Sequence, residues 1–107
     1  IPSYLGLKQT SQSITADGSS TTAVDVTSAV TEINASSATH SCAMADGSDG
    51  QIKIILNTST SGTNAITITP ANFTNTSITL NAAGESAICI FKSSKWYVIG
   101  GNGFTIA

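Results

Sequence analysis

A single histidine limits the acid–base chemistry open to this chain of 107 residues. His40 could deprotonate a nucleophile only if a carboxylate oriented its ring, as in a catalytic triad. In an extended segment His40 would share one side with Cys42 and Met44, while Ser41 would face the other. We therefore expect His40 to fill one face of a β-strand, and we expect no catalytic residue in the chain.

Two carboxylates lie close together in the segment DGSDG, which starts at Asp46. Asp46 and Asp49 could attract a calcium ion, but calcium takes about six to eight oxygen ligands and the spacing of an EF-hand is absent. Two consecutive Asp-Gly turns explain the segment more simply. Asp25, Glu32 and Glu85 are isolated in the sequence, so no carboxylate pair for glycoside hydrolysis is indicated. We expect no metal and no cofactor.

The aromatic residues could serve binding rather than catalysis. Trp96 and Tyr97 are adjacent, so on a strand their side chains face opposite sides. One of them is expected in the core, and the other is free to lie at a subunit contact or to stack on a sugar ring. A sugar site needs several aromatic side chains on one face, and a chain with three Phe, two Tyr and one Trp hardly supplies them.

The two cysteines, Cys42 and Cys89, are far apart and form no CxxC motif. Buried free thiols that behave as small apolar residues are the simpler interpretation. A disulfide between them stays open as the alternative.

The charge content excludes several classes of partner. Charged residues make up 9% of the chain, compared with about 25% in typical soluble domains, and the net charge is −2. Without a basic cluster the chain cannot neutralise phosphates, so we expect no nucleic acid and no anionic membrane surface as a partner. A surface with few charges also has little like-charge repulsion, which suits a protein that packs against copies of itself.

Alternating apolar and polar residues run through most of the sequence, and Thr and Ile favour a pleated surface. Asp-Gly, Asn and Gly turns separate these runs at intervals of about 8–12 residues. The sequence predicts an all-β fold, an antiparallel β-sandwich or jelly-roll-like barrel of about eight short strands. The predicted core consists of Ile52, Ile54, Ile66, Ile68, Ile78, Leu80, Ile88 and Ile90.

Residues 1–13 differ from the rest of the sequence. Apolar and polar residues alternate only weakly there, and the segment contains Pro2 and Gly6. We expect an extended N-terminal arm there, docked through Tyr4 and Leu5, with a frayed terminus as the alternative. Residues 14–107 are expected to form one β-sandwich domain.

Two runs of the sequence are apolar on both strand faces: KIIL, from Lys53, and SAICIF, from Ser86. A sandwich covers only one face of each sheet, so some of these side chains would be left in water. An apolar patch of this kind is best covered by identical copies. The expected assembly contacts are Tyr4, Leu5, Ile55, Trp96 and Tyr97.

The segments ADGSDGQIKIIL, ITPANF, SITLNAAGESAICIF and KWYVIGGNG occur in this order between Ala45 and Gly103. This ordered set resembles small β-structured virion proteins of tailed bacteriophages. The N-terminal half matches only loosely, through TTAVDVTSAVTEI. The resemblance implies a structural part of the particle and implies no catalytic residue.

What the resemblance implies in particular is a capsid-decorating (cement) protein on the exterior of the virion. Its partners would be copies of itself, in a homotrimer, and other virion proteins such as the major capsid protein. The alternative is a module of a trimeric tail fibre or spike, or a carbohydrate-binding adhesin domain whose exposed face would recognise a host-surface glycan.

Overall fold

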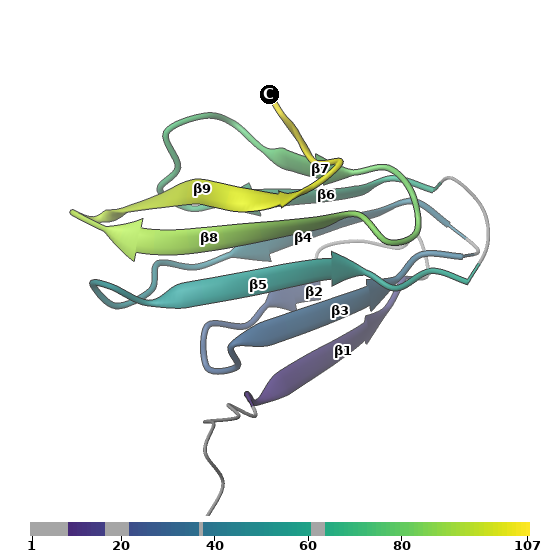
Figure 1. Cartoon of the computed structure of the whole chain (residues 1–107), viewed down its shortest axis with the longest axis horizontal. Helices are drawn as coiled ribbons and strands as arrows, with labels where there is room; N and C mark the ends of the chain where they lie inside the picture. The colour runs from purple at the N-terminus through teal and green to yellow at the C-terminus, as the bar shows by residue number, and fades with distance from the viewer. Residues whose placement is uncertain (1–8, 17–21, 37, 61–63) are drawn as a thin grey trace, which may run out of the picture.

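The computed structural model describes residues 9–16, 22–36, 38–60 and 64–107, and this part of the chain forms two β-sheets and no helix (Figure 1). Sheet A has the strand order β1 (Ser11–Thr15), β3 (Val30–Asn34), β5 (Ile52–Asn57), β8 (Ser86–Lys92) and β9 (Lys95–Asn102). Sheet B has the order β10 (Thr105–Ile106), β7 (Ile78–Leu80), β6 (Ile66–Pro70), β4 (His40–Met44) and β2 (Thr22–Val24). The all-β prediction is confirmed, with ten strands where about eight were expected.

The chain alternates between the two sheets from β1 to β6. Successive strands within a sheet are therefore parallel, as in the pairs β1–β3, β3–β5, β2–β4 and β4–β6. From β7 onward the pairs are antiparallel. The predicted all-antiparallel arrangement is therefore wrong for the N-terminal half, and the described strands form two separate sheets rather than a closed barrel. Alternation along a strand indicates which face is buried, but it carries no information on the direction of the neighbouring strand.

Local sequence signals mark several strand ends correctly. Pro70 is the last residue of β6, as expected for a residue that has no N–H to donate to a ladder. Between β8 and β9 the chain turns through Ser93 and Ser94, which have φ values of 52° and 65°. Positive φ at both central residues is typical of a type I′ hairpin turn. The segment FKSSKW, in which two residues separate Lys92 from Lys95, thus forms a tight hairpin.

The core lies between the two sheets and draws side chains from both. In sheet B the predicted core residues are fully buried: Ile66, Ile68, Ile78 and Leu80. In sheet A the prediction is wrong by one residue. Ile52 is 50% exposed, and three further predicted core residues, Ile54, Ile88 and Ile90, are only half-buried. The inner face of this sheet is instead formed by Lys53, Ile55, Ala87, Cys89, Phe91 and Trp96.

Two expected assembly contacts, Ile55 and Trp96, are fully buried and therefore unavailable to a partner. The indole Nε1 of Trp96 donates a hydrogen bond to the carbonyl oxygen of Ala45 at 2.9 Å. Its ring packs edge-to-face on Phe91, with 5.2 Å between the ring centroids. Burial of the indole with its N–H satisfied gives Trp96 a structural role in the core.

The boundary expected at residue 13 is also corrected, because β1 begins at Ser11. Tyr4 and Leu5, which were expected to dock the arm, lie outside the described residues. Cys42 and Cys89 are both buried and unbonded. Burial raises the pKa of Cys42 to about 11 and that of Cys89 to about 12, so neither thiol is activated as a nucleophile.

Candidate functional site

The outer face of sheet A carries apolar side chains that the fold leaves uncovered. In one cross-strand row Ile52 of β5 lies opposite Ile90 of β8, which lies opposite Tyr97 of β9. In the next row Ile54 lies between Val30 of β3 and Ile88 of β8. We call this surface the apolar face, and its members are Val30, Ile52, Ile54, Leu56, Ile88, Ile90, Tyr97 and Ile99.

The three most exposed members of the apolar face lie on β5 and β9. Ile52 is 50% exposed, Tyr97 37% and Ile99 57%. The β8–β9 ladder shifts register next to Ile88, and Ile99 is the β9 residue that has no counterpart across this shift. A β-bulge of this kind re-aims side chains. Three large exposed apolar side chains on one sheet face make this surface a candidate for an interaction site.

The apolar face is hollowed at the end nearest to the start of β1. The hollow has a volume of about 350 Å³ and is lined by Gln9, Ala29, Gly50, Ile52 and Ile54. None of the described residues that line it has an ionisable side chain. It is therefore suited to apolar side chains rather than to a charged ligand.

None of the eight members of the apolar face is charged, and described charged residues lie at its borders. On one side Glu32 of β3 pairs with Leu56, and its Oε1 accepts a hydrogen bond of 2.9 Å from Ser13 Oγ. At the β8–β9 hairpin Lys92 Nζ lies 2.7 Å from Asp49 Oδ2. The hydrogen bond from Lys92, followed by that from the backbone N–H of Ser93, lowers the pKa of Asp49. The face thus has an uncharged centre and a polar border, which is the usual anatomy of a protein–protein interface.

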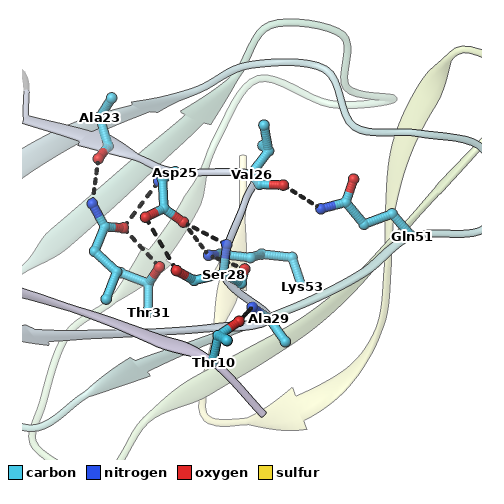
Figure 2. A network of polar contacts seen from close by, with 10 residues as sticks. Thr10, Ala23, Asp25, Val26, Ser28, Ala29, Thr31, Gln51 and Lys53 are labelled. Atoms are coloured by element: carbon cyan, nitrogen blue, oxygen red, sulfur yellow. Dashed lines mark hydrogen bonds and ion pairs between the residues drawn. The ribbon is translucent and has the colours of Figure 1, made fainter.

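A cluster of polar side chains lies on the opposite, inner side of sheet A (Figure 2). Lys53 is fully buried, and its Nζ donates to the carbonyl of Ser28 at 2.7 Å and lies 3.3 Å from Asp25 Oδ1. Burial lowers the pKa of Lys53, and the carboxylate of Asp25 partly offsets this effect. Because each charged group has a partner, the cluster is a structural feature of the loop between β2 and β3.

Gln12 extends this polar cluster to β1. Its Nε2 donates to the carbonyl of Ala23 at 3.1 Å, and its Oε1 accepts from the backbone N–H of Asp25 at 2.9 Å. The same Oε1 accepts from Thr31 Oγ1 at 2.9 Å. Figure 2 labels the three residues that Gln12 contacts: Ala23, Asp25 and Thr31. Gln12 therefore joins sheet A to β2 of sheet B.

The carboxylates of the DGSDG segment contact different partners. Asp46 accepts hydrogen bonds from Asn72 Nδ2 at 2.9 and 2.8 Å, while Asp49 binds Lys92 and Ser93. Within residues 9–16, 22–36, 38–60 and 64–107, no three His, Cys, Asp or Glu side chains are grouped to hold a metal ion. The segment ties the β4–β5 loop to its neighbours, as two turns would.

His40 lies on the inner side of β4 and is 4% exposed. Its Nε2 is 3.2 Å from Thr22 Oγ1, and its Nδ1 has no hydrogen-bond partner among the described residues. Its described contact is thus a hydroxyl, whereas a general base in a triad is oriented by a carboxylate. His40 therefore fills the strand face that it was expected to fill.

Among the described aromatic residues only Tyr97 is classed as exposed; Phe91 and Trp96 are buried, and Phe73 and Phe104 are half-buried. A sugar-binding platform requires at least a second exposed ring beside it. The described surface offers Tyr97 to a partner as an apolar contact with a hydroxyl at its tip.

Sequence reasoning found that an apolar surface would be left over but assigned it to the wrong side chains. Of the expected contacts in the described chain, Tyr97 is exposed, whereas Ile55 and Trp96 are not. The missed members are Val30, Ile52, Ile54, Leu56, Ile88, Ile90 and Ile99. No local sequence signal could have identified them, because the ion pair that turns Lys53 and Ile55 inward joins Lys53 to Asp25, 28 residues away.

No known protein family matches the chain, and no curated protein matches its sequence. Among the described residues no helix is long and apolar enough to cross a membrane.

Proposed function

We propose that this chain is a non-enzymatic structural protein of a virus particle, in particular a capsid-decorating protein on the particle exterior. The apolar face carries the assembly part of this proposal, because Ile52, Tyr97 and Ile99 lie exposed on one sheet surface. The location on a virion rests on the resemblance of residues 45–103 to β-structured phage virion proteins.

Copies of the chain are the proposed occupants of the apolar face. Burying one large apolar side chain stabilises a contact by about 1.5–3 kcal/mol, and symmetry repeats each contribution in every subunit. Few charges surround the face, so two copies meet little electrostatic repulsion. The expected assembly is a homotrimer, as the resemblance implies.

The second proposed partner is another virion protein, such as the major capsid protein. A decorating protein has no turnover, and it acts by bridging neighbouring capsid subunits. Many identical weak contacts over a shell give a large effective affinity. In this proposal residues 1–8, with Tyr4 and Leu5, form an arm that reaches a neighbouring subunit.

The apolar face is tested by comparing exposed isoleucines on the two sheets. The double variant Ile52→Ser and Ile99→Ser removes two exposed side chains from the apolar face. Ile106, which is 38% exposed on β10 of sheet B, supplies the matched control Ile106→Ser. Light scattering at several concentrations should give a trimer mass for the wild type and the control, and a monomer mass for the double variant.

A wild-type protein that stays monomeric at high concentration would refute self-assembly. The virion location is tested separately, by probing purified tailed-phage particles with an antibody against this chain. Decoration of the capsid surface is the expected result. Labelling confined to the tail would replace the decorating function with that of a tail-fibre module, and absence of labelling would reject both.

A further inference from the structure

Strand β1 is an outer edge of sheet A, and its backbone hydrogen bonds show in which direction its N–H and C=O groups point. Val30 N donates to the carbonyl of Thr10 at 3.1 Å, and Ala16 N donates to the carbonyl of Asn34 at 2.8 Å. The groups of Thr10 and Ala16 therefore face β3. Because backbone groups alternate in direction along a parallel ladder, Gln12 and Ile14 also face β3. The N–H and C=O groups of Ser11, Ser13 and Thr15 then point away from the sheet.

The other three sheet edges in the described chain are short or partly covered. The edge strand β10 is two residues long. On β9 the N–H of Trp96 donates to the carbonyl of Asn72 at 2.8 Å, which covers one end of that edge. On β2 the carbonyl of Ala23 accepts a hydrogen bond from Gln12 Nε2. No described strand lies beyond β1 in sheet A.

The sequence of β1 lacks the features by which proteins block pairing at an edge. Such edges usually carry a Lys, a Pro, a bulge or an inward-pointing charge. The residues of β1 are Ser, Gln, Ser, Ile and Thr, and its pairing with β3 is regular over all five positions. Ser11, Ser13 and Thr15 are exposed and uncharged, so an identical strand can approach without repulsion.

We propose that β1 pairs with β1 of a second copy, antiparallel across a twofold axis that passes beside Ser13. In this register Ser13 lies opposite its own equivalent, and Ser11 lies opposite Thr15 of the other copy. Every outward N–H and C=O of the three residues then finds a partner, because all of these pairs are of the hydrogen-bonded type. A register centred on Ser11 or Thr15 would leave some of these groups unpaired.

The pairing joins two sheets A into one continuous sheet and places two apolar faces side by side. It goes beyond the proposed function, because it uses a strand edge rather than the apolar face. Five residues of edge pairing make a weak contact in isolation, and repetition in an assembly strengthens it. The contact of the apolar face and the contact of the β1 edge can therefore be separated by experiment.

Disulfide trapping tests the register in the full-length protein. Hydrogen-bonded antiparallel pairs have Cα atoms about 5.5 Å apart, within the range that a disulfide spans. Ser13→Cys should therefore form a covalent dimer on mild oxidation, as judged by non-reducing electrophoresis. Ser11→Cys alone should not, because its equivalents would be about 14 Å apart, four residues at about 3.4 Å each. A mixture of Ser11→Cys and Thr15→Cys proteins should cross-link.

Ser41→Cys is the control for random collision, since Ser41 is exposed on β4, in the interior of sheet B. The native Cys42 and Cys89 are buried and should not contribute. Ser13→Cys cross-linking no faster than Ser41→Cys, or Ser11→Cys cross-linking as fast as Ser13→Cys, would overturn the proposal.

Proline substitution separates the β1 edge from the apolar face. Ser13→Pro removes an N–H that points away from β3, so the fold should survive while the pairing is lost. In the double variant Ile52→Ser and Ile99→Ser, the β1 edge is intact, and Ser13→Cys added to it should still give a covalent dimer. The measurement adds Ser13→Pro to both proteins of the Ser11→Cys and Thr15→Cys mixture. If this mixture still forms a disulfide-linked dimer, the edge contact is refuted, while the proposed contact of the apolar face is unaffected.

Discussion

Lys53 Nζ lies 3.3 Å from Asp25 Oδ1 at the inner side of sheet A, where Lys53 is fully buried and Asp25 is one-third exposed. A buried ammonium group is tolerated only when its charge is compensated, and here Asp25 and the carbonyl of Ser28 compensate it. This ion pair connects the β2–β3 loop to the centre of the sheet. It also sets which face of β5 is buried.

Removing Asp25 alone should destabilise the protein, and removing Lys53 as well should offset this loss. Asp25→Asn leaves the Lys53 ammonium buried without its counter-charge and should lower the free energy of unfolding by about 2–3 kcal/mol. Lys53→Met replaces the ammonium with an apolar side chain of similar length and should be neutral or stabilising in the Asp25→Asn background. Urea denaturation of the single and double variants measures both effects. Equal losses for Asp25→Asn in the wild type and in the Lys53→Met background would contradict the coupling.

Acid should destabilise the protein through Asp25. Burial alone would raise the pKa of Asp25, but hydrogen bonds from Ser28 and the charge of Lys53 outweigh it and lower the pKa below the ordinary value of 3.8. As the pH falls through about 3.8, the unfolded chain binds the proton first, so the free energy of unfolding decreases until the folded carboxyl is protonated as well.

Thermal unfolding between pH 7 and pH 2 measures this dependence. Asp49 contributes in the same direction, because the hydrogen bond from Lys92 lowers its pKa. The difference between the wild type and Asp25→Asn isolates Asp25, and the variant should lose less stability in acid. An identical loss in both proteins would contradict this role of Asp25.

The register of β5 predicts a sharp contrast between neighbouring isoleucines. Ile55 is fully buried, so Ile55→Ala should lower the free energy of unfolding by about 2–5 kcal/mol. Ile52 is 50% exposed, so Ile52→Ala should cost less than about 1 kcal/mol. Chemical denaturation at a protein concentration where both variants have the same mass provides the measurement. The reverse order of these two losses would show that the other face of β5 is buried.

The β8–β9 turn offers a stabilising substitution. Ser93 and Ser94 both have positive φ, which costs energy in residues with a Cβ atom. Asn-Gly is the preferred pair for such a turn, so Ser93→Asn with Ser94→Gly should raise the free energy of unfolding by about 0.5–1 kcal/mol. A small rise in melting temperature is the expected result. The control is Ser41→Asn, at an exposed strand position, which should bring no gain.

Gly101 should tolerate no side chain. Its φ is 140°, and a Cβ atom built there would overlap the carbonyl oxygen of Ser86. Gly101→Ala should therefore destabilise the protein by more than about 1 kcal/mol, because backbone atoms of β8 would have to move. Gly100→Ala is the matched control, since the nearest atom to its Cβ would be a side-chain carbon of Ile88 at 3.8 Å. Similar melting temperatures for the two variants would contradict this.

Local signals in the sequence predicted much of the strand content. β-branched residues favour a strand at Val30–Asn34, and Pro70, which has no N–H to donate, is typical of a strand end such as that of β6. In β6 and β7 the polar side of each strand is Thr and the apolar side is Ile or Leu, so the buried face could be read directly. The expectation that the chain holds no catalytic triad also came from residue types, because the sequence has a single histidine and its acids are scattered.

Two features were decided only by the tertiary structure. In KIIL and SAICIF both strand faces are apolar, so alternation could not indicate which side would be buried. The contact between Lys53 and Asp25, which are 28 residues apart, places the face of β5 that carries Lys53 on the inner side of the sheet. Strand direction was likewise open, because a strand has the same alternation whether its neighbour is parallel or antiparallel. Only the passage of the chain from one sheet to the other made β1, β3 and β5 parallel and left β1 at the edge.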